Sequence, residues 1–595
     1  MSDGKRLRRC VGVVLVCLLT FAALPVSAAL KITAVDAPVR TVGGPVPAEV
    51  SPEGGWCLWS SGQVGEYVRV EKGGTYTVVV RAGGTRAAGV DPQMTLMIDG
   101  RAGIGRVVPK EQAGNPKEPH YTCTVKSGAY DDYTFLLEMT PGVHRLTVAF
   151  MNDYAMPAPG GSRQTGPWKE DRNLYVSEIR VIAPKGAPEV AKSDAKAWQA
   201  ALAHHEKETL AMSADQIEKL RKADVTVRVL EAGGKPVPGA KLAVRLKRHE
   251  FLFGCNIYMF GRFGTTAEND AYAKRFAELF NYATTGFYWR AYEPKRGQPN
   301  YKYTDKVVAF CRRHEIRMKG HPLLWACEFG VPRWSQGQPA ADVQRQRVEG
   351  ILARYKGKIA AYEVVNEPAH LDGIKIDEPY RWARQADPQA YLIVNDYEVL
   401  GNGYLPFFDL LAKAKADGVP FDGIGVQAHE PLGMRFPLDG VEETLDRYAT
   451  LGKELHITEF TPTSDGRPVV GGEGKWDEAA QADYAEEFYR VCFAHPAVVA
   501  VTWWDLCDRG AWQAGGGMLR KDLSPKPVYA ALQRLIHQEW TTRAAGQTDK
   551  DGRWTFRGFL GRYELKVDGR PVEGQWQLPK SAEGKPAEWT VRLGR

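Results

Sequence analysis

Between Phe251 and Gln538 the sequence changes eight times from a short apolar run to a helical stretch. The apolar runs are rich in β-branched residues, as are strands that a parallel sheet buries on both faces. Stretches such as 340–355 have the composition and spacing of helices. Eight such units in about 290 residues fit a (β/α)8 barrel, for which about 250 residues is typical. The runs begin near Phe251, Asn281, Ile316, Ala361, Tyr391, Asp422, Glu454 and Val498.

An open, doubly wound sheet is the alternative to a barrel. Its first strand would be followed by a glycine-rich phosphate-binding loop, and no loop of that kind follows the run 251–254. We therefore predict an α/β fold whose main part is a (β/α)8 TIM barrel over residues 248–540.

The chain is too long for one hydrophobic core, and three to four domains are expected for 595 residues. Residues 30–184 contain short alternating runs between glycine-rich turns, which predicts an N-terminal β-sandwich module. Residues 185–223 are rich in Ala, Lys, Glu and Gln and predict a helical connector. Small accessory β elements are expected beside the barrel, a hairpin over 224–247 and a C-terminal β unit over 541–595. Because the latter is too short for a secure core of its own, we expect these two elements to pair in one small sandwich.

Residues 1–28 have the features of a secretory signal peptide. A basic segment (5–9) precedes an apolar segment (11–24), and small residues at 26–28 form a cleavage site. The apolar segment has about 14 residues, fewer than the roughly 20 that span a bilayer. We therefore expect secretion in soluble form, to the extracellular space or the periplasm, without a membrane anchor after cleavage.

The charge of the chain gives no reason to expect a nucleic-acid partner. The formal charge falls from +7 to +4 without residues 1–28, because that segment carries four basic residues and one acidic residue. The remaining Lys and Arg residues are dispersed, whereas a nucleic-acid footprint is a patch or stripe. A monomer is expected.

Seven of the nine cysteines follow residue 28, an odd number for an oxidising compartment. Cys57 and Cys123 both lie in the β-rich N-terminal region and are the pair that we expect to form a disulfide. The other five fall in apolar barrel segments and are expected to be packed thiols. No CxxC pair or His-rich cluster predicts zinc.

Two of the apolar runs end in a glutamate, Glu367 and Glu459. A (β/α)8 barrel places its chemistry at the C-terminal ends of its strands. Two carboxyl groups at the ends of two such strands, facing one cleft, are the equipment of a retaining glycosidase. A single glutamate after a strand is commonplace because loops are polar, so the interpretation depends on the neighbouring residues.

Polar or aromatic residues follow six of the eight predicted strands. One of them alone, such as His429, would be explained as a satisfied core residue. Six strands that deliver such groups to one rim are expected at the binding site of a polar ligand. In chain order these groups are Gly320-His321, Asn366-Glu367, Asn395-Asp396-Tyr397, Gln427-Ala428-His429, Glu459 and Trp503-Trp504-Asp505.

In these segments the chain resembles glycoside hydrolase family 10, the endo-β-1,4-xylanases. The resemblance covers the whole barrel, about half of the chain, and its motifs occur in family order. It implies a retaining endo-1,4-β-xylanase that needs no cofactor for catalysis and acts on xylan or a related plant cell-wall β-1,4-polysaccharide. The matching segments are Phe251-Leu252-Phe253-Gly254, Glu293-Pro294-Lys295-Arg296-Gly297, Gly320-His321-Pro322-Leu323-Leu324-Trp325, Val364-Val365-Asn366-Glu367, Asn395-Asp396-Tyr397, Gly425-Val426-Gln427-Ala428-His429, Ile457-Thr458-Glu459 and Pro525-Lys526-Pro527-Val528-Tyr529.

The resemblance also implies the roles of individual residues. Glu367 would be the acid/base and Glu459 the nucleophile of a double displacement. Asn366 would hydrogen-bond the sugar 2-hydroxyl, and His429 would orient the nucleophile. Aromatic faces suit the apolar C–H surface of a sugar ring. The substrate-binding residues that we expect are His321, Asn366, Gln427, His429, Trp504, Trp512 and Tyr288.

The chain departs from the family pattern at the sugar grip. Where the family carries Glu-Asn-x-x-Lys after the second strand, this chain has Thr284, Thr285 and Tyr288, and the family's second histidine is Ala326. A charged, hydrogen-bonding grip is thus missing. The alternatives to a xylanase are a β-1,4-glucanase or transglycosylase on the same scaffold and a non-catalytic carbohydrate-binding protein.

Residues 34–183 resemble the calcium-dependent xylan-binding modules. The resemblance depends on Asn152-Asp153 and on the segment 171–176. Carboxylate oxygens are the ligands that Ca²⁺ prefers, and a bound Ca²⁺ with open positions can coordinate sugar hydroxyls. Asp153 and Asp171 are the calcium ligands that we expect. The alternative is that these acids cap turns or pair with Arg172.

Overall fold

The computed structural model describes residues 29–595 except 42, 60–61, 103–104, 109–121, 163–165, 372, 403–404, 430–432, 434, 470–473, 581–585 and 595. The signal peptide predicted over 1–28 lies outside the described residues. No helix in the described part of the chain has both the length and the apolar composition that crossing a membrane requires.

The predicted (β/α)8 barrel is confirmed. Eight parallel strands form a closed ring, in which β20 pairs with β19 on one side and β22 on the other, and a short strand β21 also pairs with β22. Each strand begins at or within one residue of its predicted start. The strands are β18 (Leu252–Asn256), β19 (Tyr282–Gly286), β20 (Arg317–His321), β21 (Leu324–Trp325), β22 (Ala361–Asn366), β23 (Tyr391–Asp396), β24 (Gly423–Ala428), β25 (Glu454–Phe460) and β26 (Val498–Trp503).

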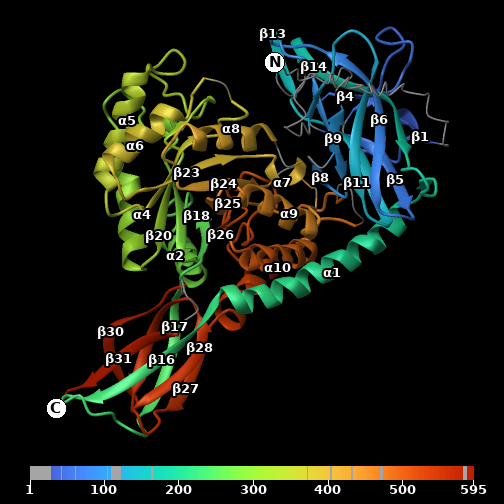
Figure 1. Cartoon of the computed structure of the whole chain (residues 1–595). Coiled ribbons are helices and arrows are strands. Elements are labelled where there is room, and N and C mark those ends of the chain that lie inside the picture. The colour runs from blue at the N-terminus through green and yellow to red at the C-terminus, as the bar shows by residue number, and fades with distance from the viewer. Residues whose placement is uncertain are drawn as a thin grey trace, which may run out of the picture.

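Helices lie between the strands and cover the outside of the barrel (Figure 1). Local signals fix some of their ends: Thr265 and Glu268 form a capping box at the start of α2, and the Asp477 carboxylate caps α10. The helices of the barrel region are α2 (Thr266–Leu279), α3 (Trp289–Tyr292), α4 (Tyr301–Arg313), α5 (Ala341–Tyr355), α6 (Asp377–Ala386), α7 (Val399–Asn402), α8 (Leu405–Ala416), α9 (Leu438–Ala449), α10 (Glu478–Ala494), α11 (Pro527–Arg534) and the π-helical turn η2 (Leu535–Glu539).

Two tyrosine rings pack against strand glycines near the N-terminal ends of the barrel strands. A Cβ added to Gly254 would lie 3.0 Å from Cδ1 of Tyr282, and one added to Gly423 would lie 2.7 Å from the ring of Tyr391. A larger residue at either position would therefore force the facing tyrosine ring to move.

Two antiparallel sheets pack face to face in the N-terminal module (Figure 1). The first contains β1 (Leu30–Thr33), β3 (Gly44–Pro45), β4 (Trp56–Leu58), β6 (Gly74–Thr85), β9 (Gly105–Val108), β11 (Asp131–Met139), β13 (Tyr154–Ser162) and β14 (Gly166–Ile182). The second contains β2 (Val39–Arg40), β5 (Gln63–Val70), β7 (Gln93–Ile98), β8 (Arg101–Ala102), β10 (Thr122–Thr124), β12 (Gly142–Phe150) and β15 (Ala191–Lys192). A short 3-10 helix, η1 (Ala34–Asp36), follows β1.

The prediction of a disulfide between Cys57 and Cys123 is wrong. Cys57 lies on β4 of the first sheet and Cys123 on β10 of the second, and both are buried free thiols. Burial raises the pKa of Cys57 to about 12, with a smaller contribution from Asp171. The two residues belong to the same β-rich region but to different sheets, and membership of a region was all that the sequence could indicate.

A long helix, α1 (Ala195–Leu220), connects the N-terminal module to the rest of the chain (Figure 1). At its start the Trp198 indole N–H donates to Asp99 Oδ1 of the module at 2.8 Å. At its end the Arg221 guanidinium donates to three backbone carbonyls of the barrel, those of Phe493, His495 and Val498. The connector is thus anchored at both ends.

The strands before and after the barrel form one small sandwich, as expected, but the hairpin predicted over 224–247 is wrong. Strand β16 (Lys222–Glu231) pairs with β28 and β31, while β17 (Lys241–His249) pairs with β27 and β29 of the other sheet. The loop between β16 and β17 crosses from one sheet to the other, so each strand finds its partners in the C-terminal segment. That segment contains β27 (Arg543–Gln547), β28 (Arg553–Phe559), β29 (Gly561–Val567), β30 (Arg570–Leu578) and β31 (Ala587–Leu593).

Candidate active site

The two glutamates lie at the same end of the barrel. Glu367 directly follows β22, and Glu459 lies near the end of β25. Glu367 has a φ of 56°, in the left-handed region, which costs a non-glycine residue about 1–3 kcal/mol. Its backbone N–H donates to the carbonyl of Asn395 on β23 at 2.8 Å, so a neighbouring strand holds this conformation.

Two asparagine side chains bridge the two carboxyl groups. Asn395 Nδ2 donates to Glu459 Oε1 at 2.9 Å and to Asn366 Oδ1 at 2.8 Å. Asn366 Nδ2 in turn donates to Glu367 Oε1 at 3.0 Å. Side-chain hydrogen bonds thus link the ends of β22, β23 and β25 and fix the orientation of one carboxyl group relative to the other.

Glu367 is held by further donors and is largely shielded from water. Trp325 Nε1 donates to Oε2 at 2.8 Å, and Gln427 Nε2 donates to Oε1 at 3.1 Å. Burial raises the pKa of Glu367 to about 7, and the nearby Asp396 carboxylate adds to the rise, while the hydrogen bonds from Gln427 and Trp325 oppose it. This carboxyl group can therefore carry a proton near neutral pH.

Glu459 is more deeply buried, and only 4% of its surface is exposed. His321 Nδ1 lies 3.9 Å from its Oε1, and His429 Nε2 lies 3.8 Å from its Oε2. Burial and the neighbouring Glu363 carboxylate raise its pKa well above the usual range, and the Lys319 ammonium and the hydrogen bond from Asn395 offset only part of that rise. The stabilising partners of the charged form are thus a cation and an amide donor.

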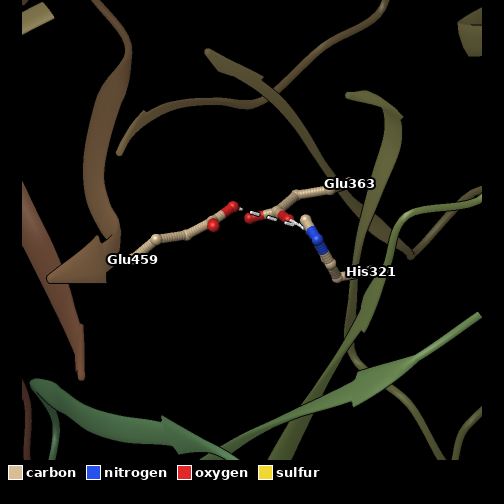
Figure 2. Close-up of side chains that lie close together, drawn as sticks. All are labelled: His321, Glu363 and Glu459. Atoms are coloured by element: carbon tan, nitrogen blue, oxygen red, sulfur yellow. Dashed lines mark hydrogen bonds and ion pairs between the residues drawn. The ribbon is translucent and has the colours of Figure 1, made fainter. Parts of the chain in front are cut away.

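A buried ionic cluster lies next to Glu459. Glu363 accepts hydrogen bonds from Lys319 Nζ and from His321 Nδ1, and Figure 2 shows His321, Glu363 and Glu459 converging from different strands. Burial alone would raise the pKa of Glu363, but Lys319 and His321 lower it to about 2. Burial lowers the pKa of His321, so the ring is neutral, with its proton on Nδ1 where Glu363 accepts it.

The same three side chains have the geometry of a possible metal site. His321, Glu363 and Glu459 offer ligand atoms within 4.8 Å of one another, and within the described ranges no other group of three or more His, Cys, Asp or Glu does so. Glu363 is already paired with Lys319, which supplies the positive charge inside the cluster. The donor set is thus occupied by the protein's own hydrogen bonds.

The two expected sugar-contacting tryptophans differ in exposure. Trp504 is 5% exposed and packs edge-on against His321, with ring centroids 5.2 Å apart. Trp512 is 58% exposed and stacks on His429, with centroids 4.4 Å apart. His429 Nε2 in turn contacts Gln427 Oε1 at 2.9 Å. Trp512 therefore presents an open aromatic face, whereas Trp504 is part of the packed floor.

The sequence of this chain is similar to a known family of enzymes. The sequence profile of glycosyl hydrolase family 10 matches residues 252–535. An endo-1,4-beta-xylanase of Agaricus bisporus is 30% identical over 306 residues, which cover 45% of this chain and 89% of that protein. The chain belongs to glycosyl hydrolase family 10.

Other proteins are similar to parts of this chain. The anti-sigma-I factor RsgI6 of Acetivibrio thermocellus is 28% identical over 59% of this chain and 46% of its own length. The chain spans less than half the length of several curated relatives that it matches. A crystal structure of xylanase 10B from Thermotoga petrophila RKU-1 in complex with xylobiose aligns with 49% of this chain and 95% of its own, at 23% identity and a TM-score of 0.42.

Aromatic side chains surround the position where the family pattern implied charged sugar-binding residues, which the sequence lacks. Thr284 and Thr285 are fully buried, and their hydroxyls have no hydrogen-bond partner among the described residues. The Tyr288 ring packs edge-on against Tyr258 and Trp325, with centroids 5.8 and 5.9 Å apart. Packed aromatic rings thus lie at the position where the family resemblance implied a charged grip.

Sequence reasoning missed several residues that hold this site. Lys319 and Glu363 occur at inward positions of β20 and β22, and a charged residue inside an apolar run was the signal that could have identified them. Near Glu367, His370 Nδ1 bonds Asp396 Oδ1 at 2.6 Å. Burial would lower the pKa of His370, but Asp396 and Glu398 raise it to about 9.

Residues 77–194 match the profile of a calcium-dependent xylan-binding carbohydrate-binding module. Asp171 lies on β14, opposite Ala155 of β13, so Asp153 and Asp171 come to the same end of this hairpin. The Asp171 carboxylate accepts from Asn173 Nδ2 at 3.0 Å. Arg172 donates to the backbone carbonyls of Val90, Ala87 and Asn152.

The Lys319–Glu363 pair generates a stability prediction. Lys319→Met leaves the buried Glu363 carboxylate without a cationic partner, although His321 still donates to it, and should lower the free energy of unfolding by about 3–5 kcal/mol in urea titrations. The double variant Lys319→Met/Glu363→Leu removes both charges and should recover most of that loss. A double variant as unstable as Lys319→Met would contradict the role of charge pairing here.

Proposed function

We propose that this chain is a secreted, retaining endo-1,4-β-xylanase that hydrolyses xylan with Glu459 as nucleophile and Glu367 as acid/base. The observation that carries the proposal is the asparagine bridge between two carboxyl groups in different electrostatic environments. A retaining glycosidase needs such a pair, because one carboxyl group must donate a proton while the other attacks.

In the first step Glu459 attacks the anomeric carbon and forms a glycosyl ester. The bond from that carbon to the leaving oxygen breaks, and Glu367 gives its proton to the leaving oxygen. The raised pKa of Glu367, about 7, suits this donation. Glu459 lies near Lys319 and accepts from Asn395, so its charged form has partners before the ester forms.

In the second step the Glu367 carboxylate accepts a proton from a water molecule, whose oxygen attacks the anomeric carbon. The ester bond breaks and Glu459 leaves as a carboxylate. Trp325 and Gln427 donate to Glu367 and hold it in place for both steps.

The remaining predicted residues would bind the sugar. Asn366, already hydrogen-bonded to Glu367, would bind the sugar 2-hydroxyl. The neutral His321 donates its Nδ1 proton to Glu363, so its Nε2 would accept a hydrogen bond from a sugar hydroxyl. His429 would orient Glu459, and Gln427 would hold the His429 ring through their 2.9 Å contact. The exposed face of Trp512 would stack on a sugar, since the C–H face of a sugar ring is apolar.

A second candidate function is a β-1,4-glucanase or transglycosylase on the same scaffold. The observation that favours it is the aromatic wall at Tyr288, which replaces a charged grip. Retention of both Glu367 and Glu459 argues against a non-catalytic carbohydrate-binding protein. Tyr288 would contact the sugar in either enzyme, by packing rather than by charge.

The N-terminal module would deliver the enzyme to its polymer. Its family description supports calcium-dependent binding of xylan. We assign Asp153 and Asp171 as calcium ligands because they meet at one end of the β13–β14 hairpin. Secretion through the 1–28 signal fits a polymer that cannot enter the cell.

Hydrolysis by wild type and Glu459→Gln tests the enzyme. Reducing-sugar release from xylan should fall by several orders of magnitude in Glu459→Gln, because the amide cannot form the ester but keeps the bond from Asn395. Glu442→Gln, a partly shielded glutamate on α9, is the matched control and should retain activity. A wild type as inactive as Glu459→Gln would refute the enzyme, and faster release from mixed-linkage glucan than from xylan would favour the second candidate.

The role of Glu367 predicts a pH dependence. The kcat/KM for xylooligosaccharides should fall as the pH rises through about 7, because the acid loses its proton. Glu367→Gln should slow their hydrolysis by about 10²–10⁴-fold. With a dinitrophenyl glycoside, whose leaving group needs no proton, the first step should survive this substitution; equal losses on both substrates would contradict the assignment.

Calorimetric titration of the full-length Glu459→Gln variant with xylooligosaccharides tests the module. EDTA should abolish one class of binding, and Asp171→Asn should weaken that class without affecting the barrel. Binding that is equal with and without EDTA would contradict a calcium-dependent site.

A further inference from the structure

His370 lies in the turn that directly follows β22 and the proposed acid/base Glu367. The backbone carbonyl of Glu367 accepts from the N–H groups of His370 at 3.3 Å and of Leu371 at 3.0 Å. These two bonds close the turn in which Glu367 has its left-handed φ of 56°. Any group that holds the His370 side chain therefore also helps to fix the backbone of Glu367.

A buried carboxylate, Asp396 at the end of β23, fastens this turn to the neighbouring strand. His370 Nδ1 lies 2.6 Å from Asp396 Oδ1, and the backbone N–H of Ala369 donates to Oδ2 at 2.8 Å. The backbone N–H of Tyr397 donates to Oδ1 at 2.9 Å. The Asp396 side chain is 0% exposed, and a carboxylate removed from water in this way keeps its charge only with such partners.

Carboxylates lie near both nitrogens of the His370 ring. In addition to Asp396 at Nδ1, Glu398 places its Oε2 3.7 Å from Nε2. The ring also stacks on that of Tyr397, with centroids 3.6 Å apart and 16° between the planes, and an aromatic face favours a cation. Burial would lower the pKa of His370, but the two carboxylates outweigh burial and raise it to about 9. His370 is thus an imidazolium at neutral pH.

The backbone is strained where this network joins the two strand ends. Glu367 after β22 has a φ of 56°, and Glu398 in the loop after β23 has a φ of 58°. Each such conformation costs a non-glycine residue about 1–3 kcal/mol and persists only where surrounding contacts fix it. The bonds between His370 and Asp396 join the two loops that carry these residues.

The two charges of the His370–Asp396 pair act on the acid/base in opposite directions. Burial is the main cause of the raised pKa of Glu367. The Asp396 carboxylate adds to the rise, and the His370 imidazolium opposes it. Without the imidazolium, Asp396 would act on Glu367 without its counter-charge, and Glu367 would hold its proton more tightly.

Titratable groups from other parts of the barrel also interact with Glu367. Glu459 on β25 is a carboxyl group, and its charge would add to that of Asp396. Burial raises the pKa of Tyr288, just before α3, and of Cys327, just after β21, so both side chains are uncharged at neutral pH. These neighbours are anionic or neutral and do not replace the positive charge of His370.

We propose that His370 is a positioning residue for the acid/base, an imidazolium that offsets the Asp396 carboxylate and keeps the Glu367 proton available for transfer in both directions. The inference rests on the proposed acid/base role of Glu367. That residue must lose its proton in the first step and accept one in the second, so its pKa has to stay near the working pH. The cation in its own turn prevents a further rise.

The pH dependence of kcat/KM for xylooligosaccharides tests this role in two variants. His370→Gln keeps a hydrogen-bond donor for Asp396 but removes the charge, and should move the alkaline limb of the profile upward by roughly one pH unit. His370→Lys keeps a positive charge and should leave the limb close to its wild-type position. A limb that stays in place in both variants, or that moves equally in both, would overturn the proposal.

Histidine NMR of the wild-type, full-length chain is a second measurement, which depends neither on activity nor on the folding of a variant. The His370 signals can be assigned through nuclear Overhauser contacts to the stacked Tyr397 ring. Both ring nitrogens should carry protons at neutral pH, and one proton should be lost near pH 9. A neutral His370 ring at pH 7 would overturn the proposal.

The variant Glu367→Gln separates a failure of this inference from a failure of the proposed function. The alkaline limb should disappear in Glu367→Gln, because the group that titrates is gone. A limb near pH 7 that persists in this variant would refute the acid/base role itself, and with it the inference, whatever the protonation state of His370.

Discussion

The active site depends on one buried cation, the Lys319 ammonium inside the barrel. Glu363 pairs with Lys319 and then has a second oxygen with which to accept from His321. This fixes the proton of the neutral His321 ring on Nδ1, beside Glu459. A buried charge pair gives little net stability, since desolvation offsets the attraction. Its value here is electrostatic, because it supplies Glu459 with a cation that water cannot screen.

The two carboxyl groups differ because their surroundings differ. Glu367 has Trp325, Gln427 and Asn366 as neutral donors, and burial raises its pKa to about 7. Glu459 accepts from Asn395 and lies in the field of Lys319, although burial and the Glu363 carboxylate still hold its pKa well above its usual range. Pairs of titratable groups that their environments distinguish are the usual sign of divided acid and base roles. The hydrogen bonds of Asn366 and Asn395 hold the Glu367 and Glu459 carboxyl groups in a fixed relative orientation.

The barrel could be predicted from sequence because short apolar runs alternate with helical stretches eight times, and polar or aromatic residues follow six of those runs. The same reasoning placed Glu367 and Glu459 at one rim. It could not identify the partners of Glu363 or Asn395, since those contacts depend on the register between strands, which shifts near Asn366 and near Glu459. The hairpin and the Cys57–Cys123 pair failed for a similar reason, because neighbouring segments joined different sheets.

The anomeric configuration of the first product tests the double displacement most directly. A xylooligosaccharide is hydrolysed with excess enzyme, and proton NMR follows the new reducing end before mutarotation. Attack by Glu459 inverts the anomeric carbon, and attack by water inverts it again. The β configuration is therefore retained, and the β anomer should appear first. An α anomer at the earliest times would contradict a covalent intermediate on Glu459 and with it the proposed roles of both glutamates.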